Sequence, residues 1–211
     1  MNSTNSPSPQ KEAARPAAKG FGLPSWDQLG LPLLLTLLAL LCWLWPGSHE
    51  NLIWSRQALA QDQWWRMWTG HLLHSNTHHL LLNLAGLAAI FALHQPHYRT
   101  LPMLTLSVLL MGLISLGIWW GVPGIERYVG LSALLHGLFT WGALQDIRRG
   151  WRSGWLLLLG VIAKVGWEQF SGGSESTSAL IDARIAVESH LLGVVSALFI
   201  FLLLRLYHWA R

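Results

Sequence analysis

The chain has 211 residues, of which 52% are hydrophobic and only 11% are charged. Soluble domains carry about 25% charged residues, so this composition excludes an ordinary water-soluble protein and indicates a protein of the lipid bilayer. The net charge of +4 does not indicate a nucleic-acid partner, because the basic residues form no stripe interleaved with aromatic side chains. The 14 Trp residues agree with a bilayer protein, since their amphipathic rings favour the membrane–water interface.

Apolar segments follow a polar N-terminal stretch. Residues 1–25 are rich in Ser, Pro, Asn and Ala, and we expect them to form a disordered cytoplasmic tail. A helix that spans a bilayer needs about 20 mostly apolar residues. Six segments approach this length: 29–45, 77–95, 100–121, 131–147, 153–170 and 187–208. The sequence therefore predicts an all-α membrane protein with six transmembrane helices in one domain, residues 26–211.

The basic residues predict the orientation of these helices. If the N-terminus is cytoplasmic, nine Lys and Arg residues lie on the cytoplasmic side and four on the outer side. The nine are Lys11, Arg15, Lys19, Arg99, Arg148, Arg149, Arg152, Arg205 and Arg211, and the four are Arg56, Arg66, Arg127 and Arg184. The positive-inside rule then places both termini in the cytoplasm. The long, Trp-rich loop 46–76 lies outside, and we expect it in the interface.

A histidine-rich stretch joins this loop to the second apolar segment. His79 and Asn83 are four residues apart and therefore share one face of a helix. Both side chains can donate hydrogen bonds towards one point, as a developing oxyanion requires. We expect His74 to tie the loop by a structural hydrogen bond, and His71 and His78 to be interfacial histidines that meet water.

A Gly-x-Ser motif opens the fourth apolar segment. Gly130 permits a tight backbone turn, and Ser132 would then lie at the N-terminus of the helix. Free N–H groups and the positive end of the helix dipole gather there, which suits a serine whose reaction creates negative charge nearby. The alternative is that Ser132 serves only as an N-cap.

His190 lies near the outer end of the last apolar segment. Gly193 and Ala197 follow at a spacing of four residues, and a small-residue face of this kind lets another helix approach closely. If that helix is the fourth, His190 lies beside Ser132. Together with His79, these residues would form a site with a nucleophile, a base and oxyanion donors.

In combination these motifs resemble the rhomboid family of intramembrane serine proteases. The matching elements are Trp65-Arg66, His79 with Asn83, Gly130-x-Ser132 and His190-x-x-Gly193. The resemblance implies a six-helix rhomboid bundle that acts as a serine endopeptidase without metal or cofactor. It also implies that His190 is the base for Ser132 and that His79 and Asn83 stabilise the oxyanion.

Two further features resemble rhombosortase, a bacterial branch of this family. Many rhomboids have a Tyr four residues after the serine, whereas this chain has His136 in the string Gly-Leu-Ser-x-Leu-Leu-His-Gly. The second feature is the Lys164-x-x-x-Glu168-Gln169 run. This resemblance implies membrane-anchored exported substrates with a C-terminal Gly-Gly motif and a transmembrane tail. It further implies a multi-pass protein of the bacterial inner membrane with its active site near the periplasmic side.

Several alternatives remain open. His136 lies one helical turn from Ser132 and could itself be the base; otherwise we expect it to pack against His190 or to shape the substrate pocket. Lys164 and Glu168 could form a structural ion pair or recognise substrate. The chain could also be a rhomboid protease with other membrane substrates, an inactive rhomboid-like binding protein, or a metal or haem protein ligated by its histidines. The last of these lacks a His-Glu-x-x-His motif.

Overall fold

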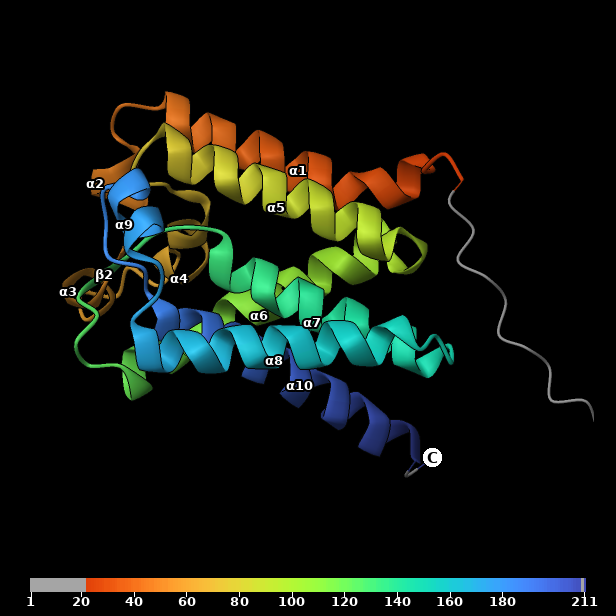
Figure 1. Cartoon of the computed structure of the whole chain (residues 1–211). Helices are drawn as coiled ribbons and strands as arrows, with labels where there is room; N and C mark the ends of the chain where they lie inside the picture. The colour runs from red at the N-terminus through yellow and green to blue at the C-terminus, as the bar shows by residue number, and fades with distance from the viewer. Residues whose placement is uncertain (1–21, 210) are drawn as a thin grey trace, which may run out of the picture.

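The computed structural model describes residues 22–209 and 211 and consists mainly of long helices that run side by side (Figure 1). The long helices are α1 (Trp26–Leu44), α5 (Thr77–His94), α6 (Thr100–Gly121), α7 (Ser132–Arg148), α8 (Ser153–Ser171) and α10 (Val187–Trp209). The short elements are α2 (Ser48–Leu52), β1 (Trp54–Ser55), α3 (Arg56–Leu59), α4 (Arg66–Thr69), η1 (Gly70–Leu72), η2 (Gln95–His97), β2 (Arg127–Tyr128) and α9 (Glu175–Ile181). The tail predicted over 1–25 falls almost wholly on residues 1–21, outside the described part.

Four helices of the described chain are long and apolar enough to cross a membrane, namely α1, α5 with η2, α6 and α10. The chain is therefore an all-α membrane protein, as its composition predicted. The helices α7 and α8 also coincide with predicted segments, but α7, with 17 residues, is shorter than these four helices, and α8, with 19 residues, is less apolar. Six spanning helices are thus not confirmed. The helix α7 packs against α5, α6, α8 and α10, and this central position explains why it needs no broad lipid-facing surface.

The backbones of α7 and α10 approach each other closely. A Cβ atom placed on Gly193 would overlap the carbonyl oxygen of Ala133, and a Cβ on Gly137 would lie 3.2 Å from the carbonyl oxygen of Gly193. Ala197, one turn further along α10, is fully buried. The small-residue face predicted on the last helix therefore exists, and its partner is the helix that begins with Ser132.

The segment 46–76 folds into a cap of short elements at one end of the bundle (Figure 1). The buried Arg66 links the parts of this cap. Its guanidinium donates hydrogen bonds to the carbonyl oxygens of Ile53 (3.0 Å) and Glu50 (2.8 Å) and to Oε1 of Gln63 (2.7 Å). The strand β1 pairs with β2 in antiparallel register. Since β2 precedes α7, this pairing fixes the turn that leads to Ser132.

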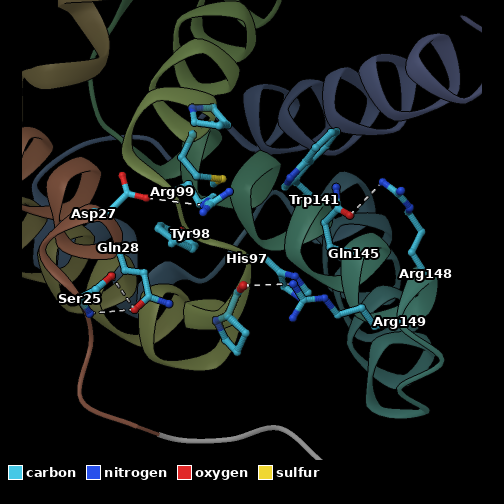
Figure 2. Close-up of a pocket in the computed structure, with 13 residues that line it drawn as sticks. Ser25, Asp27, Gln28, His97, Tyr98, Arg99, Trp141, Gln145, Arg148 and Arg149 are labelled. Atoms are coloured by element: carbon cyan, nitrogen blue, oxygen red, sulfur yellow. Dashed lines mark hydrogen bonds and ion pairs between the residues drawn. The ribbon is translucent and has the colours of Figure 1, made fainter. Parts of the chain in front are cut away.

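The opposite end of the bundle holds both ends of the described chain (Figure 1). A cavity of about 720 Å³ lies there between the start of α1, the α5–α6 turn and the end of α7. Figure 2 shows Arg99 beside Asp27 (3.6 Å) and Arg149 donating to the Pro96 carbonyl oxygen (3.3 Å). Several of the basic residues assigned to the cytoplasmic side thus gather at this end.

The Gly193 contact makes a testable prediction about packing. Gly193→Ala forces α10 away from α7, and an overpacked core contact of this kind costs about 1–3 kcal/mol. We expect a lower midpoint of thermal unfolding in detergent than for wild type. Gly160→Ala on α8 is the matched control, because a Cβ there meets no atom within 4 Å. Equal midpoints for Gly193→Ala and wild type would show that the two helices do not meet as described.

Candidate active site

Ser132 and His190 are hydrogen-bonded to each other at the capped end of the bundle. The distance from Ser132 Oγ to His190 Nε2 is 3.0 Å. The helix α7 begins at Ser132, with Leu131 as its N-cap, so the interpretation of Ser132 as the cap residue is wrong. Gly130 has φ +118°, a left-handed conformation that favours glycine. The predicted turn is therefore present, and it presents the hydroxyl group to the imidazole.

His79 lies in the first helical turn of α5, next to the backbone turn at Gly130. Its Nδ1 accepts a hydrogen bond from the Ser75 backbone N–H (3.3 Å), so a neutral ring carries its proton on Nε2. A Cβ on Gly130 would lie 2.7 Å from that Nε2 and 3.8 Å from Nδ2 of Asn83. Both nitrogen atoms therefore lie beside the backbone turn that precedes Ser132.

Further hydrogen bonds hold Asn83 and the Gly130 turn in place. Asn83 Nδ2 donates to the His79 carbonyl oxygen (3.1 Å), which leaves a second N–H on the same atom. The Tyr128 hydroxyl donates to the Gly130 carbonyl oxygen (2.8 Å). Burial raises the pKa of Tyr128, so the phenol stays protonated and keeps this hydrogen bond.

The accessory residues His136, Lys164 and Glu168 all contact this site. The His136 ring stacks on the His190 ring at 4.2 Å between centroids and 18° between planes, as one of the two expectations for His136 predicted. Lys164 Nζ lies 2.6 Å from Glu168 Oε1, which is the predicted ion pair. Glu168 Oε2 also lies 2.9 Å from His190 Nδ1. This second contact was not predicted from the sequence.

An apolar cavity opens beside the serine. Its volume is about 570 Å³, and it lies between α5, α7 and α8. Most of its lining is aliphatic or aromatic, and the polar groups that reach it are Asn83, Ser132, His136 and Lys164. The cavity can therefore hold an apolar chain with one end against the Ser132 hydroxyl.

The remaining histidines of the cap are structural. His71 was expected to meet water, but it is fully buried, and its Nε2 lies 3.2 Å from the Met111 carbonyl oxygen. This expectation is wrong because the cap folds over η1. His78 is exposed, as expected. The hydrogen bond expected to tie the loop at His74 involves its backbone oxygen, which accepts from the His49 ring (3.2 Å). The His74 ring itself packs edge-on against His79 at 5.0 Å, and its two nitrogen atoms have no hydrogen-bond partner in the described structure.

Two groups within the described residues have ligand atoms close enough to hold a metal ion. They are His94 with His97 and Asp146, and His136 with Glu168 and His190. In the first group, His97 Nε2 and Asp146 Oδ1 are 2.6 Å apart, a hydrogen bond that ties η2 to α7. In the second group, Lys164 Nζ lies 3.0 Å from His136 Nε2. A cation so close to this ligand atom opposes the binding of a second cation.

No protein-family model matches this sequence, and no curated protein matches it either. The functional argument therefore depends on the residues and their geometry. That geometry provides a hydroxyl with a base within hydrogen-bond reach, two donors beside the neighbouring backbone turn and an adjacent apolar cavity. Such an arrangement can carry out nucleophilic acyl transfer.

The burial of His71 predicts a dependence of stability on pH. Desolvation lowers the pKa of His71 to about 4, whereas an unfolded histidine has a pKa near 6.5. The unfolded chain therefore binds more protons between these values, and the free energy of unfolding falls as the pH is lowered from about 6.5 to 4, by at most about 1.4 kcal/mol per pH unit for this group. We expect the slope to be shallower in His71→Phe than in wild type, measured by unfolding in detergent. Identical slopes would contradict a neutral, buried His71.

Proposed function

We propose that this protein is an intramembrane serine endopeptidase. The observation that carries the proposal is the 3.0 Å contact between Ser132 Oγ and His190 Nε2, with His79 and Asn83 as donors beside it. This geometry supports His190 over His136 as the base, because His136 Nδ1 donates instead to the Ser132 carbonyl oxygen (2.8 Å). The resemblance to the rhomboid family assigns the same roles to the same residues.

In the proposed reaction, Ser132 Oγ attacks the carbonyl carbon of a peptide bond while His190 Nε2 takes the hydroxyl proton. The oxygen of the scissile carbonyl becomes an oxyanion, which His79 Nε2–H and the free N–H of Asn83 stabilise. His190 then gives its proton to the departing amine, and an acyl-enzyme forms on Ser132. Water or another nucleophile releases the acyl group with His190 again acting as base.

The proposed substrates are membrane-anchored exported proteins with a C-terminal Gly-Gly motif and a transmembrane tail. The apolar cavity beside Ser132 supports an apolar substrate segment, and the Gly-Gly motif follows from the resemblance to rhombosortase. We infer a six-helix topology in which α7 and α8 also cross the bilayer, since both run alongside the four apolar helices (Figure 1). Both termini are then cytoplasmic, and Ser132 lies near the outer, periplasmic side of the bacterial inner membrane.

Two other functions predict different outcomes. A rhomboid protease with other membrane substrates would use the same residues but ignore the Gly-Gly motif. At this site a metal protein is favoured by the proximity of His136, Glu168 and His190, and the ammonium group of Lys164 opposes it. Stoichiometric metal in the purified protein, retained after dialysis and lost in His190→Ala, would favour the metal protein.

Removal of the nucleophile tests the proposed protease directly. Ser132→Ala deletes the hydroxyl that attacks the carbonyl, so we expect no cleavage of a co-expressed Gly-Gly-tailed exported protein, with C-termini mapped by mass spectrometry. The matched control is Ser107→Ala, since Ser107 is also buried but donates to Met103 within its own helix (2.8 Å). Cleavage by purified Ser132→Ala protein at the wild-type rate would remove Ser132 from the mechanism.

Removal of an oxyanion donor should slow the chemical step. We expect Asn83→Ala to lower kcat by about 10²–10³-fold, the usual cost of losing one such donor, with a smaller change in KM. The side chain of the exposed Asn51 donates to the Gly47 carbonyl oxygen one turn away (2.8 Å), and Asn51→Ala leaves the backbone oxygen that accepts from Trp65 in place, so this variant should keep the wild-type kcat. A change in KM alone for Asn83→Ala would assign Asn83 to substrate binding.

A further inference from the structure

We infer that Glu168 is a positioning residue for His190, so that the site is a Ser132–His190–Glu168 triad. The inference rests on the proposed protease function and extends it. The Glu168 side chain is only 13% exposed, although it carries a charge and lies on the outer half of α8. Its two oxygens have separate partners, Lys164 Nζ at 2.6 Å and His190 Nδ1 at 2.9 Å.

The hydrogen bonds form a closed ring that begins and ends at Ser132. The Ser132 carbonyl contacts His136 Nδ1 (2.8 Å), and His136 Nε2 contacts Lys164 Nζ (3.0 Å). Lys164 contacts Glu168, Glu168 contacts His190, and His190 contacts Ser132 Oγ (3.0 Å). Three helices contribute to this ring, namely α7, α8 and α10.

The chemistry of the partners fixes each proton in the ring. A carbonyl oxygen only accepts, so His136 carries its proton on Nδ1, and its Nε2 accepts from the ammonium group of Lys164. Lys164 is a donor only, so it also donates to Glu168, which accepts as a carboxylate. The other carboxylate oxygen accepts from His190 Nδ1–H. The lone pair of His190 Nε2 is then directed at the Ser132 hydroxyl, which is the tautomer that a general base requires.

The ring also accounts for Lys164 and His136. Lys164 neutralises Glu168, which lowers the cost of holding a carboxylate in an apolar environment. His136 is neutral in this arrangement, so its ring stacks on His190 without adding charge and restricts rotation of the catalytic imidazole. When His190 takes the proton of Ser132, its Nδ1–H stays bonded to Glu168, and the carboxylate stabilises the imidazolium without itself taking a proton.

The inference predicts the kinetics of Glu168→Gln. The amide lacks the charge that stabilises the imidazolium, and its NH₂ group can hold His190 in the wrong tautomer. We expect kcat to fall on the order of 10²-fold or more, as for other triads, with little change in KM. Glu168→Asp should recover part of kcat. Glu126→Gln, at an exposed carboxylate on the capped end, is the matched control and should equal wild type.

A pH profile separates this role from a merely structural one. The rate of Ser132 modification by a fluorophosphonate reports the basicity of His190 and needs no protein substrate. The titratable groups around His190 are Glu168 from α8, His136 from α7 and His79 from α5, with Lys164 behind Glu168 and His136. Loss of the carboxylate makes the imidazole less basic, so the acidic limb of the rate-against-pH curve should move to lower pH in Glu168→Gln. If the modification rate and the position of this limb were the same in Glu168→Gln as in wild type, the inference would be overturned.

The outcomes also separate this inference from the proposed function. If Ser132→Ala abolishes cleavage while Glu168→Gln behaves as wild type, only the triad is wrong. If Ser132→Ala still cleaves, the protease proposal is wrong.

Should Glu168→Gln fail to fold, ¹⁵N-histidine NMR of the wild-type protein tests the triad instead. We expect the His190 signal, assigned by its loss in His190→Gln, to show protonated Nδ1 and free Nε2 in the neutral form of the ring. The opposite tautomer would overturn the triad.

Discussion

At Gly193 the backbone of α10 comes so close to the Ala133 carbonyl oxygen of α7 that no side chain fits between them. This contact determines how far apart Ser132 and His190 can be, because each lies within one turn of it. A hydrogen bond of 3.0 Å between side chains on different helices tolerates little change in helix separation. The other features of the site, including the Gly130 turn, the cap and the position of α8, act on two helices whose distance is already set here.

Around this contact, the site concentrates polar groups in a largely apolar protein. Unpaired polar groups are costly in such an environment, and the ring of hydrogen bonds from Ser132 through His136, Lys164 and Glu168 to His190 gives each one a partner. One positive and one negative charge offset each other within it. Stability and chemistry thus have the same requirement, since the pairing that makes the charges tolerable also directs the lone pair of His190 at the serine.

The sequence predicted the helices well and the contacts between distant segments less well. The six long helices lie within a few residues of the six apolar segments, because an apolar run of that length specifies its own helix. Spacing also predicted the Lys164–Glu168 pair and the shared face of His79 and Asn83, since both are set by the helix period. The burial of His71 could not be predicted, because its ring contacts Met111 and Ser115 of α6 and Tyr128 of β2, all of which are 40 or more residues away in the sequence. The contact of Glu168 with His190 was missed for a similar reason: it depends on the rotation of α8 about its axis, which no local pattern determines.

The central claim is that His190, held beside Ser132 by the α7–α10 contact, activates that serine and no other. The most direct measurement is the rate at which a fluorophosphonate modifies the intact wild-type protein and its His190→Ala variant, with the modified residue located by mass spectrometry. The account predicts modification of wild type at Ser132 and a rate reduced on the order of 10²-fold or more in the variant. Modification of Ser132 at equal rates in both proteins would contradict it.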